Sequence, residues 1–209
     1  MKNKIVIIAN GTIHDTVFHK KLLEGFDIII CADGGAYSAK KMDIIPDYII
    51  GDLDSASSSI IEFFKKNNTK IIYDNNQEKT DLELAISLAE TLDPYEILIL
   101  GAIGDRIDHT LANILCLANI KPDIKVQIID DKNTIELVDS AIDITGEKDE
   151  IISIVPLTDL LGLSYSGLKW IVNNKDTKFG WFGISNRISE YNANISLNSG
   201  KILVIKVRE

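Results

Sequence analysis

Short runs of β-branched and aliphatic residues alternate with helical patterns over the first two-thirds of the chain. The candidate strands are Lys4–Ala9, Asp27–Cys31, Tyr48–Ile50, Lys70–Tyr73, Glu96–Leu100 and Lys125–Ile129. Between them, apolar residues recur at spacings of three and four in Thr16–Glu24, Ala36–Met42, Ser57–Lys66, Thr80–Thr91 and Ile107–Ala118. This alternation predicts a parallel sheet wound with helices.

Near Lys132 the pattern changes to short alternating segments without a long helix. These segments are Thr134–Val138, Ile142–Thr145, Glu150–Ile154, Leu163–Tyr165, Ala193–Leu197 and Ile202–Val207. They predict an antiparallel β-sandwich, with Asn173–Asp176 as a hairpin loop between strands. We therefore expect an α/β domain over residues 1–132 and a β-sandwich over residues 133–209.

Composition and charge exclude several classes of protein. The 209 residues are 45% hydrophobic and 25% charged, a balance that excludes disorder and fibres, and no apolar run approaches a membrane span. The formal charge of −9 argues against nonspecific nucleic-acid binding. The N-terminus lacks the pattern of a signal peptide, so we expect a cytoplasmic protein, and the isolated Cys31 and Cys116 are interpreted as structural thiols.

Acidic residues gather where the predicted parallel strands end. Asp33 follows the second strand, Asp52 and Asp54 follow the third, and the loop after the fourth leads to Asp81. Asp105 and Asp108 follow the fifth strand. Ligands of open α/β sheets bind outside the carboxyl ends of the strands, so we expect these six carboxylates to converge on one edge.

Carboxylates crowded in this way are tolerated when a divalent cation neutralises them, and Mg²⁺ prefers such hard oxygen ligands. In an extended Asp52-Leu53-Asp54 segment, both carboxylates would lie on one side while Leu53 enters the core. A lone Asp is more often a helix cap or turn residue. The Gly-Asp-x-Asp-Ser pattern at a strand end favours the metal site instead.

Glycines and basic residues in the same loops point to phosphate. Gly34-Gly35, Gly51, Gly101 and Gly104 allow backbone to approach an anion, although none of them forms a Walker A loop or a Gly-x-Gly-x-x-Gly fingerprint. Arg106 either bridges phosphate oxygens or pairs with Asp105 or Asp108. His109 is suited to capping, phosphate positioning or proton transfer, whereas His14 and His19 are expected on a helix surface.

Taken together, these motifs resemble the bacterial thiamine pyrophosphokinase family. The resemblance rests on residues 31–36 (CADGGA), 46–47 with 51–55 (GDLDS), 79–83 (KTDLE) and 101–109 (GAIGDRIDH), and continues through 167–170, 183–186 and 199–204. It thus extends over nearly the whole chain in the family's order. It departs at Asp105, where the family usually has a second Gly, and at Gln77-Glu78, which replace Lys-Asp; both changes imply weaker ATP affinity.

The resemblance implies a Rossmann-like parallel α/β domain followed by an antiparallel β-sandwich. It implies a Mg²⁺-dependent transferase that moves a diphosphate from ATP to thiamine, releases AMP and works as a homodimer. Asp52, Asp54 and Asp81 would hold the metal and form the catalytic set. The nucleotide side would comprise Asp33, Gly34, Thr80, Gly101, Gly104, Arg106, Asp108 and His109, and the sandwich would bring Trp170, Ser185 and Asn186 to thiamine from a neighbouring chain.

Two alternatives remain open from the sequence: a kinase that transfers only the γ-phosphoryl group, and a nonenzymatic nucleotide or thiamine sensor. Either Asp81 or Asp54 is suited to deprotonate the thiamine hydroxyl. The cationic thiamine ring would suit an aromatic face such as Trp170 or Trp181, although both residues also fit a sandwich core.

Overall fold

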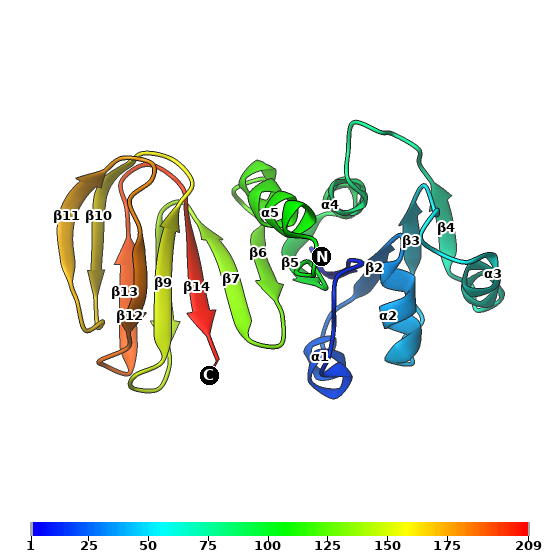
Figure 1. Cartoon of the computed structure of the whole chain (residues 1–209), viewed down its shortest axis with the longest axis horizontal. Coiled ribbons are helices and arrows are strands. Elements are labelled where there is room, and N and C mark those ends of the chain that lie inside the picture. The colour runs from blue at the N-terminus through cyan, green and yellow to red at the C-terminus, as the bar shows by residue number, and fades with distance from the viewer. Residues whose placement is uncertain (1, 209) are drawn as a thin grey trace. The chain divides into compact units, whose positions relative to one another are not determined.

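A computed structural model describes residues 2–208, which form two compact units, 2–131 and 132–208. The N-terminal unit is a parallel sheet of six strands in the order β6-β5-β1-β2-β3-β4 (Figure 1). The strands are β1 (Asn3–Ile8), β2 (Ile28–Ala32), β3 (Tyr48–Gly51), β4 (Lys70–Tyr73), β5 (Pro94–Leu100) and β6 (Lys125–Ile129). The predicted Rossmann-like arrangement is confirmed.

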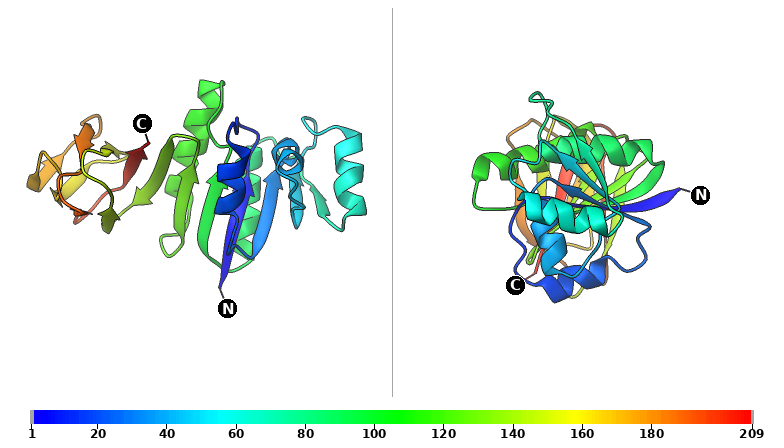
Figure 2. Two further views of the ribbon diagram at one scale, coloured as in Figure 1. Left: turned by 90° about the horizontal axis from the view of Figure 1, so that it is seen from below. Right: turned by 90° about the vertical axis from the view of Figure 1, so that its right-hand side faces the viewer.

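Helices cover both faces of this sheet. They are α1 (Thr16–Leu22), α2 (Gly35–Lys41), α3 (Ser58–Lys66), α4 (Asp81–Thr91) and α5 (Ile107–Leu115), which continues into a 3₁₀ turn, η1 (Cys116–Asn119). In the right-hand view of Figure 2, α1, α2 and α3 lie on one side of the strands and α4 and α5 on the other. Both faces of the central strands are therefore buried, which explains their almost continuous aliphatic sequences.

Helix α3 illustrates how the apolar spacing fixes the packing. Its residues Ile60 and Phe64 are four apart and lie on one face of the helix, where both side chains are buried in the core. Phe63, the neighbouring residue, is 38% exposed and contacts the Phe64 ring edge to face. Adjacent aromatic residues thus have opposite environments.

The C-terminal unit is an antiparallel sandwich of two sheets, as the sequence predicts. One sheet has the order β12-β9-β14-β7, and the other has the order β11-β10-β13-β8. The strands are β7 (Asn133–Val138), β8 (Ala141–Thr145), β9 (Ile151–Pro156), β10 (Leu160–Ser166), β11 (Val172–Thr177), β12 (Gly183–Arg187), β13 (Asn192–Ser196) and β14 (Ile202–Val207). Their inward residues form a separate core that includes Ile152, Leu163, Ile195 and Ile202.

Two sequence-based assignments are wrong. The segment Asn173–Asp176 is not a hairpin loop but lies inside β11, whose polar middle is exposed on a sheet edge. His19 is not on the surface: its side chain is fully buried, and its Nδ1 lies 2.8 Å from the carbonyl oxygen of Asp15. A polar strand at an edge and a histidine bonded to its own helix both escape a hydrophobic-pattern analysis.

The end of the N-terminal unit holds the loop that enters α1. Both Asp131 carboxylate oxygens accept backbone N–H groups, from His14 at 3.2 Å and from Asp15 at 2.9 Å. The same carboxylate lies 3.6 Å from Nδ1 of His19. The residue at the boundary of the two units is therefore part of the structure around the first loop.

No helix in the described part of the chain has both the length and the apolar character needed to cross a membrane.

We expect Phe64→Ala to lower the free energy of unfolding of the N-terminal unit by about 3–5 kcal/mol, because it empties a fully buried ring site. Urea unfolding followed by circular dichroism measures this change. Phe63→Ala is the matched control, and it should cost about 1 kcal/mol or less because that ring is partly in water. Equal losses for the two variants would contradict the packing described for α3.

Candidate functional site

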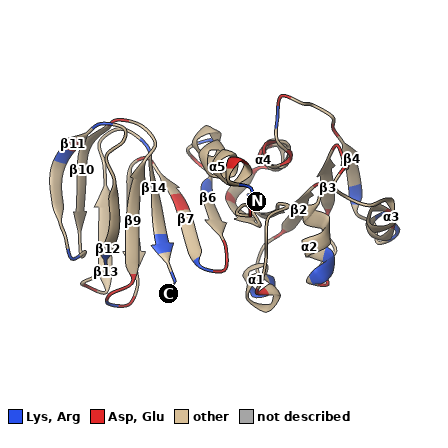
Figure 3. Ribbon diagram, viewed as in Figure 1, with Lys and Arg blue, Asp and Glu red and all other residues tan. Residues whose placement is uncertain are grey.

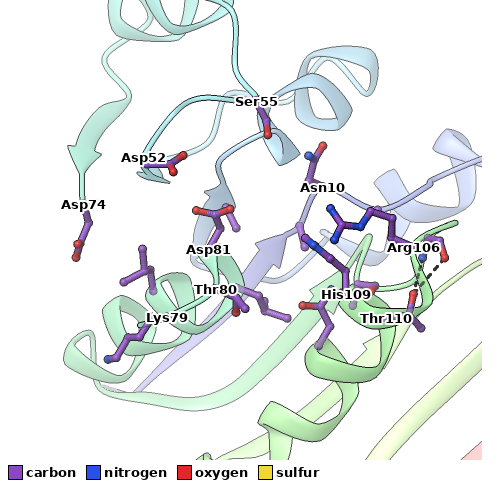
Figure 4. Close-up of a pocket in the computed structure, with 18 of the residues that line it drawn as sticks. Asn10, Asp52, Ser55, Asp74, Lys79, Thr80, Asp81, Arg106, His109 and Thr110 are labelled. Carbon is purple, nitrogen blue, oxygen red and sulfur yellow. Dashed lines mark hydrogen bonds between the residues drawn. The ribbon is translucent and has the colours of Figure 1, made fainter. Parts of the chain in front are cut away.

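The loops at the carboxyl ends of the parallel strands surround a cavity of about 520 Å³ (Figure 4). It lies where the strand order reverses between β1 and β5, so the loops that follow these two strands lead to helices on opposite faces. The first loop contributes Asn10–Thr12 and the second contributes Gly104–Arg106. The fold therefore creates a binding crevice at the position expected for an open α/β sheet.

An acidic cluster lies on the side of this site formed by β2 and β3. Single carboxylate oxygens of Asp33, Asp52 and Asp54 lie within 4.8 Å of one another, a spacing that can hold a metal ion. Asp33 is buried, Asp52 is partly exposed and Asp54 is exposed. Asp33 Oδ2 accepts the backbone N–H of Ser55 at 3.2 Å, while its buried Oδ1 has no hydrogen-bond partner.

The segment that carries two of these aspartates is not extended, contrary to the sequence-based expectation. Leu53 has a φ of +60°, in the left-handed region, and the N–H of Asp54 donates to Asp52 Oδ1 at 3.2 Å. This tight turn still directs Leu53 against the hydrophobic core. The two carboxylates are thus brought together by a turn, which a strand pattern does not predict.

Asp81 begins α4 and faces this cluster (Figure 4). Burial raises its pKa to about 6, and the charges of Asp33, Asp52 and Asp54 add to this effect. Gly51 has a φ of +148°, and a Cβ there would stand 2.8 Å from Asp81 Oδ1. The glycine at the end of β3 therefore allows the Asp81 carboxylate to approach the strand.

The first turn of α4 shows as acidic in Figure 3 because it contains Asp81 and Glu83. Thr80, which the resemblance assigned to the nucleotide, caps this helix: its Oγ1 accepts the Glu83 N–H at 3.2 Å, and Glu83 Oε2 accepts the Thr80 N–H at 2.9 Å. The Thr80 hydroxyl also donates to Glu83 at 2.9 Å. Its position at the cavity therefore has a clear structural cause.

Basic residues line the opposite side of the cavity. Arg106 and His109 lie across it from Asp52 and Asp81 in Figure 4, and Lys79 lies at its edge. The Arg106 guanidinium makes a two-point contact with Asp108, at 3.2 Å from Nε and 2.5 Å from Nη2. These bonds lower the pKa of Asp108 to about 2. The pairing considered in the sequence analysis is thus present, and both side chains remain exposed.

Only part of the predicted set lines the cavity itself, although Asp33 and Asp54 lie beside it in the acidic cluster with Asp52. Asp52, Thr80, Asp81, Gly104, Arg106 and His109 line the cavity, and Asp105 lines it as well. Asp33, Gly34, Asp54, Gly101 and Asp108 are not among its lining residues. Asn10, Asp74 and Asn113 line it without having been assigned a role from the sequence. Asn10 follows β1 directly, and its side chain lies against Gly34, where a Cβ would stand 2.3 Å from Asn10 Oδ1.

The three residues predicted to contact thiamine lie in the C-terminal unit. Trp170 is 55% exposed, and Ser185 is exposed with a φ of +60°. Asn186 is buried, and its side-chain amide makes two hydrogen bonds to the backbone of Trp170. Its Oδ1 accepts the Trp170 N–H at 3.1 Å, and its Nδ2 donates to the Trp170 carbonyl at 2.8 Å. Asn186 therefore supports Trp170. Trp181, in contrast, packs against the sandwich core.

Comparisons with known proteins match both units. The family model described as thiamin pyrophosphokinase, catalytic domain, matches residues 19–128, and the vitamin B1 binding domain of the same family matches residues 139–202. A thiamine pyrophosphokinase from Bacillus subtilis is 32% identical over 184 residues, which cover 85% of this chain and 86% of that protein. Thiamine pyrophosphokinase 2 of Arabidopsis thaliana is 27% identical, and the alignment covers 92% of this chain and 82% of that protein.

Solved structures show the same architecture. The crystal structure of the Bacillus subtilis thiamine pyrophosphokinase matches with a TM-score of 0.86 and 29% identity over 99% of both chains. The structure of thiamin pyrophosphokinase from Candida albicans matches with a TM-score of 0.81 and 23% identity. This match covers 99% of this chain and 89% of that one.

We expect Asp81→Asn to stabilise the metal-free protein at pH 8, and we expect this advantage to be clearly smaller at pH 5. The raised pKa means that the folded state binds a proton at Asp81 more tightly than the unfolded state does. Stability from this group is therefore present at low pH and is lost as the pH rises through about 6. Thermal melting in chelator from pH 5 to pH 8 measures the difference.

Asp105→Asn serves as the control for this melting series, because Asp105 is an exposed aspartate of the same cavity. It should leave the shape of the stability profile unchanged. An Asp81→Asn profile parallel to that of the wild type would show that Asp81 does not carry this proton.

Proposed function

The chain belongs to the thiamin pyrophosphokinase family, and from this membership we propose that it transfers the terminal diphosphate of ATP to the hydroxyl of thiamine, giving thiamine diphosphate and AMP. The observation that carries the proposal is the acidic cluster beside a cavity with basic residues on its other side. A diphosphate donor needs both features, since a cation must screen its charge and donors must orient its oxygens.

We assign a Mg²⁺ site to Asp33, Asp52 and Asp54. Their oxygens have the spacing of a ligand set, and Asp33 Oδ1 is buried without another partner. Hard carboxylate oxygens are what Mg²⁺ prefers, and one or two of them commonly hold it together with substrate phosphates. When bound, the ion supplies charge neutralisation for the phosphates. Asp81, which the family resemblance also gave to the metal, lies close enough to be affected by the charge of all three.

We further assign Asp81 as the acceptor of the thiamine hydroxyl proton. Without a cation, burial and the neighbouring carboxylate charges raise the pKa of Asp81 to about 6, and this raised pKa favours acceptance of a proton. Asp54, the alternative base, belongs to the proposed ligand set. Positioning of the hydroxyl in line with the β-phosphorus supplies the rest of the rate enhancement, and no covalent intermediate is required.

Side chains provide the nucleotide contacts in this proposal. Arg106 and His109 supply charge-assisted donors across the cavity from the acidic cluster, whereas the Lys79 amine donates to the Ser87 hydroxyl at 3.0 Å. Asp108 fixes the orientation of the Arg106 guanidinium through its two-point contact. The exposed Asp105 adds a negative charge to the same cavity, which is expected to weaken ATP binding.

The thiamine contacts are proposed to come from a second copy of the chain. Several large apolar side chains of the C-terminal unit are more than half exposed, including Trp170, Ile171, Phe182 and Ile184. A homodimer would cover such residues, and the Trp170 ring would offer its face to the cationic thiazolium. The proposed activity needs neither nucleic acid nor membrane, and the cytoplasmic location stays a prediction.

We expect the purified protein to convert MgATP and thiamine into AMP and thiamine diphosphate, and we expect chelator to abolish this turnover. Asp52→Asn should lower kcat by roughly 10²–10³-fold while leaving the melting temperature nearly unchanged, since it removes charge from a partly exposed side chain. Asp123→Asn, at an exposed aspartate that pairs with Lys2, is the control and should retain full activity. Chromatography of nucleotides and thiamine phosphates gives the readout.

The product pattern also separates the alternatives. ADP with thiamine monophosphate would replace the proposal by a γ-phosphoryl kinase, and ligand binding without any product would replace it by a sensor.

We expect a mixture of two impaired variants, Asp52→Asn and Trp170→Ala, to recover activity if each site combines two subunits. After random exchange of subunits, about half of the dimers contain one copy of each variant. Each mixed dimer has two sites, of which one combines the intact Asp52 with the intact Trp170. The activity should therefore recover to about a quarter of the wild-type rate. The variants are mixed after dissociation and reassembly, and assayed beside each variant alone. A mixture no more active than the mean of its components would contradict a shared site.

A further inference from the structure

The loop after β5 is anchored to α5 by two side chains of that helix. The Thr110 hydroxyl makes two hydrogen bonds to Gly104 (Figure 4). Its oxygen accepts the Gly104 N–H at 3.1 Å, and its O–H donates to the Gly104 carbonyl oxygen at 3.1 Å. Asn113 Nδ2 donates to the carbonyl of Ala102 at 2.8 Å. Residues three apart lie on one helix face, so both anchors point toward the loop.

Backbone amides of the two glycine-containing loops are already used within the protein. Gly11 N–H donates to Gly101 at 2.7 Å, Thr12 N–H donates to Ile103 at 3.0 Å, and Gly104 N–H donates to Thr110. These three groups are therefore not available to a phosphate, contrary to what a glycine-rich loop suggests. The loop contributes to binding by placing the side chains beside it.

Thr110 makes hydrogen bonds to the residue before Asp105 and to the residue after it. Its hydroxyl holds both polar groups of Gly104, and its own N–H donates to the Arg106 carbonyl at 3.0 Å. The side chain is buried, at 8% exposed, so water does not compete for the hydroxyl as it would at the surface. His109 precedes it in the helix.

We propose that Thr110 is a positioning residue for nucleotide binding: its hydroxyl fixes residues 104–106 so that Arg106 and His109 meet the phosphates in one arrangement. The identification of the ligand as ATP rests on the proposed function. The single O–H donor of Thr110 is used on the Gly104 carbonyl, so it is not available to a phosphate oxygen, and Thr110 acts through the loop although it lines the cavity.

The test compares Thr110→Val, which has nearly the same shape but no hydroxyl, with Thr110→Ser, which keeps it. Binding of MgATP without thiamine is measured by calorimetry, and KM values for both substrates are measured by product formation. We expect Thr110→Val to raise the Kd and the KM for MgATP about tenfold and to leave the KM for thiamine unchanged. Thr110→Ser should restore both nucleotide values to within about twofold of the wild type.

Thr91→Val is the matched control, since the Thr91 hydroxyl bonds only to the Leu88 carbonyl in the last turn of α4. It should change none of these values. Should Thr110→Val fail to fold, Asn113→Leu removes the second anchor, and it should raise the Kd for MgATP in the same direction, by about threefold.

An unchanged Kd for MgATP in the folded Thr110→Val protein would overturn the proposal, as would equal rises in both KM values or a failure of serine to restore binding. Wild-type protein that binds MgATP but forms no AMP would instead refute the proposed function, and the binding series would still decide the role of Thr110. Wild-type protein that does not bind MgATP would refute both.

Discussion

Repulsion among carboxylates at the ends of β2, β3 and the start of α4 is the constraint on which the site depends. Asp33, Asp52 and Asp54 lie within a few ångströms of one another, and burial together with their charges raises the pKa of Asp81. The fold keeps these groups together through the rigidity of a parallel sheet covered on both faces. A free-standing cluster of this kind would relax by moving apart, whereas here each aspartate follows a buried strand or begins a capped helix.

The two units meet different structural demands. In the N-terminal unit the N–H groups of Gly11, Thr12 and Gly104 are bonded within the protein, so these three amides do not recognise a ligand. The C-terminal unit instead leaves large aromatic and aliphatic side chains in the open, with Asn186 holding the backbone of Trp170 from within. An open polar cavity and an exposed apolar surface offer different contacts, one suited to charged groups and the other to an aromatic ring.

The sequence predicts the parallel strands, the helices and the acidic edge well because these depend on period and on strand ends, whereas the polar strands β11 and β12 are missed. Ile60 and Phe64 identify the buried face of α3 without reference to any distant residue. The left-handed turn at Leu53 is not predictable in the same way, because a leucine rarely adopts that conformation and long-range contacts must select it. Thr110 was missed for a related reason: its partner is loop backbone, and a threonine inside an amphipathic helix carries no distinctive pattern.

Asp131 shows that the last residues of one unit contribute to the structure of its first loop. Its carboxylate binds the backbone where the chain turns into α1, shortly after Asn10 and Gly11 leave the cavity. The boundary is therefore a poor place for a circular permutation or an inserted fusion partner. A truncated protein that consists of the N-terminal unit alone has to retain this aspartate to keep the hydrogen bonds of the segment that leads into α1.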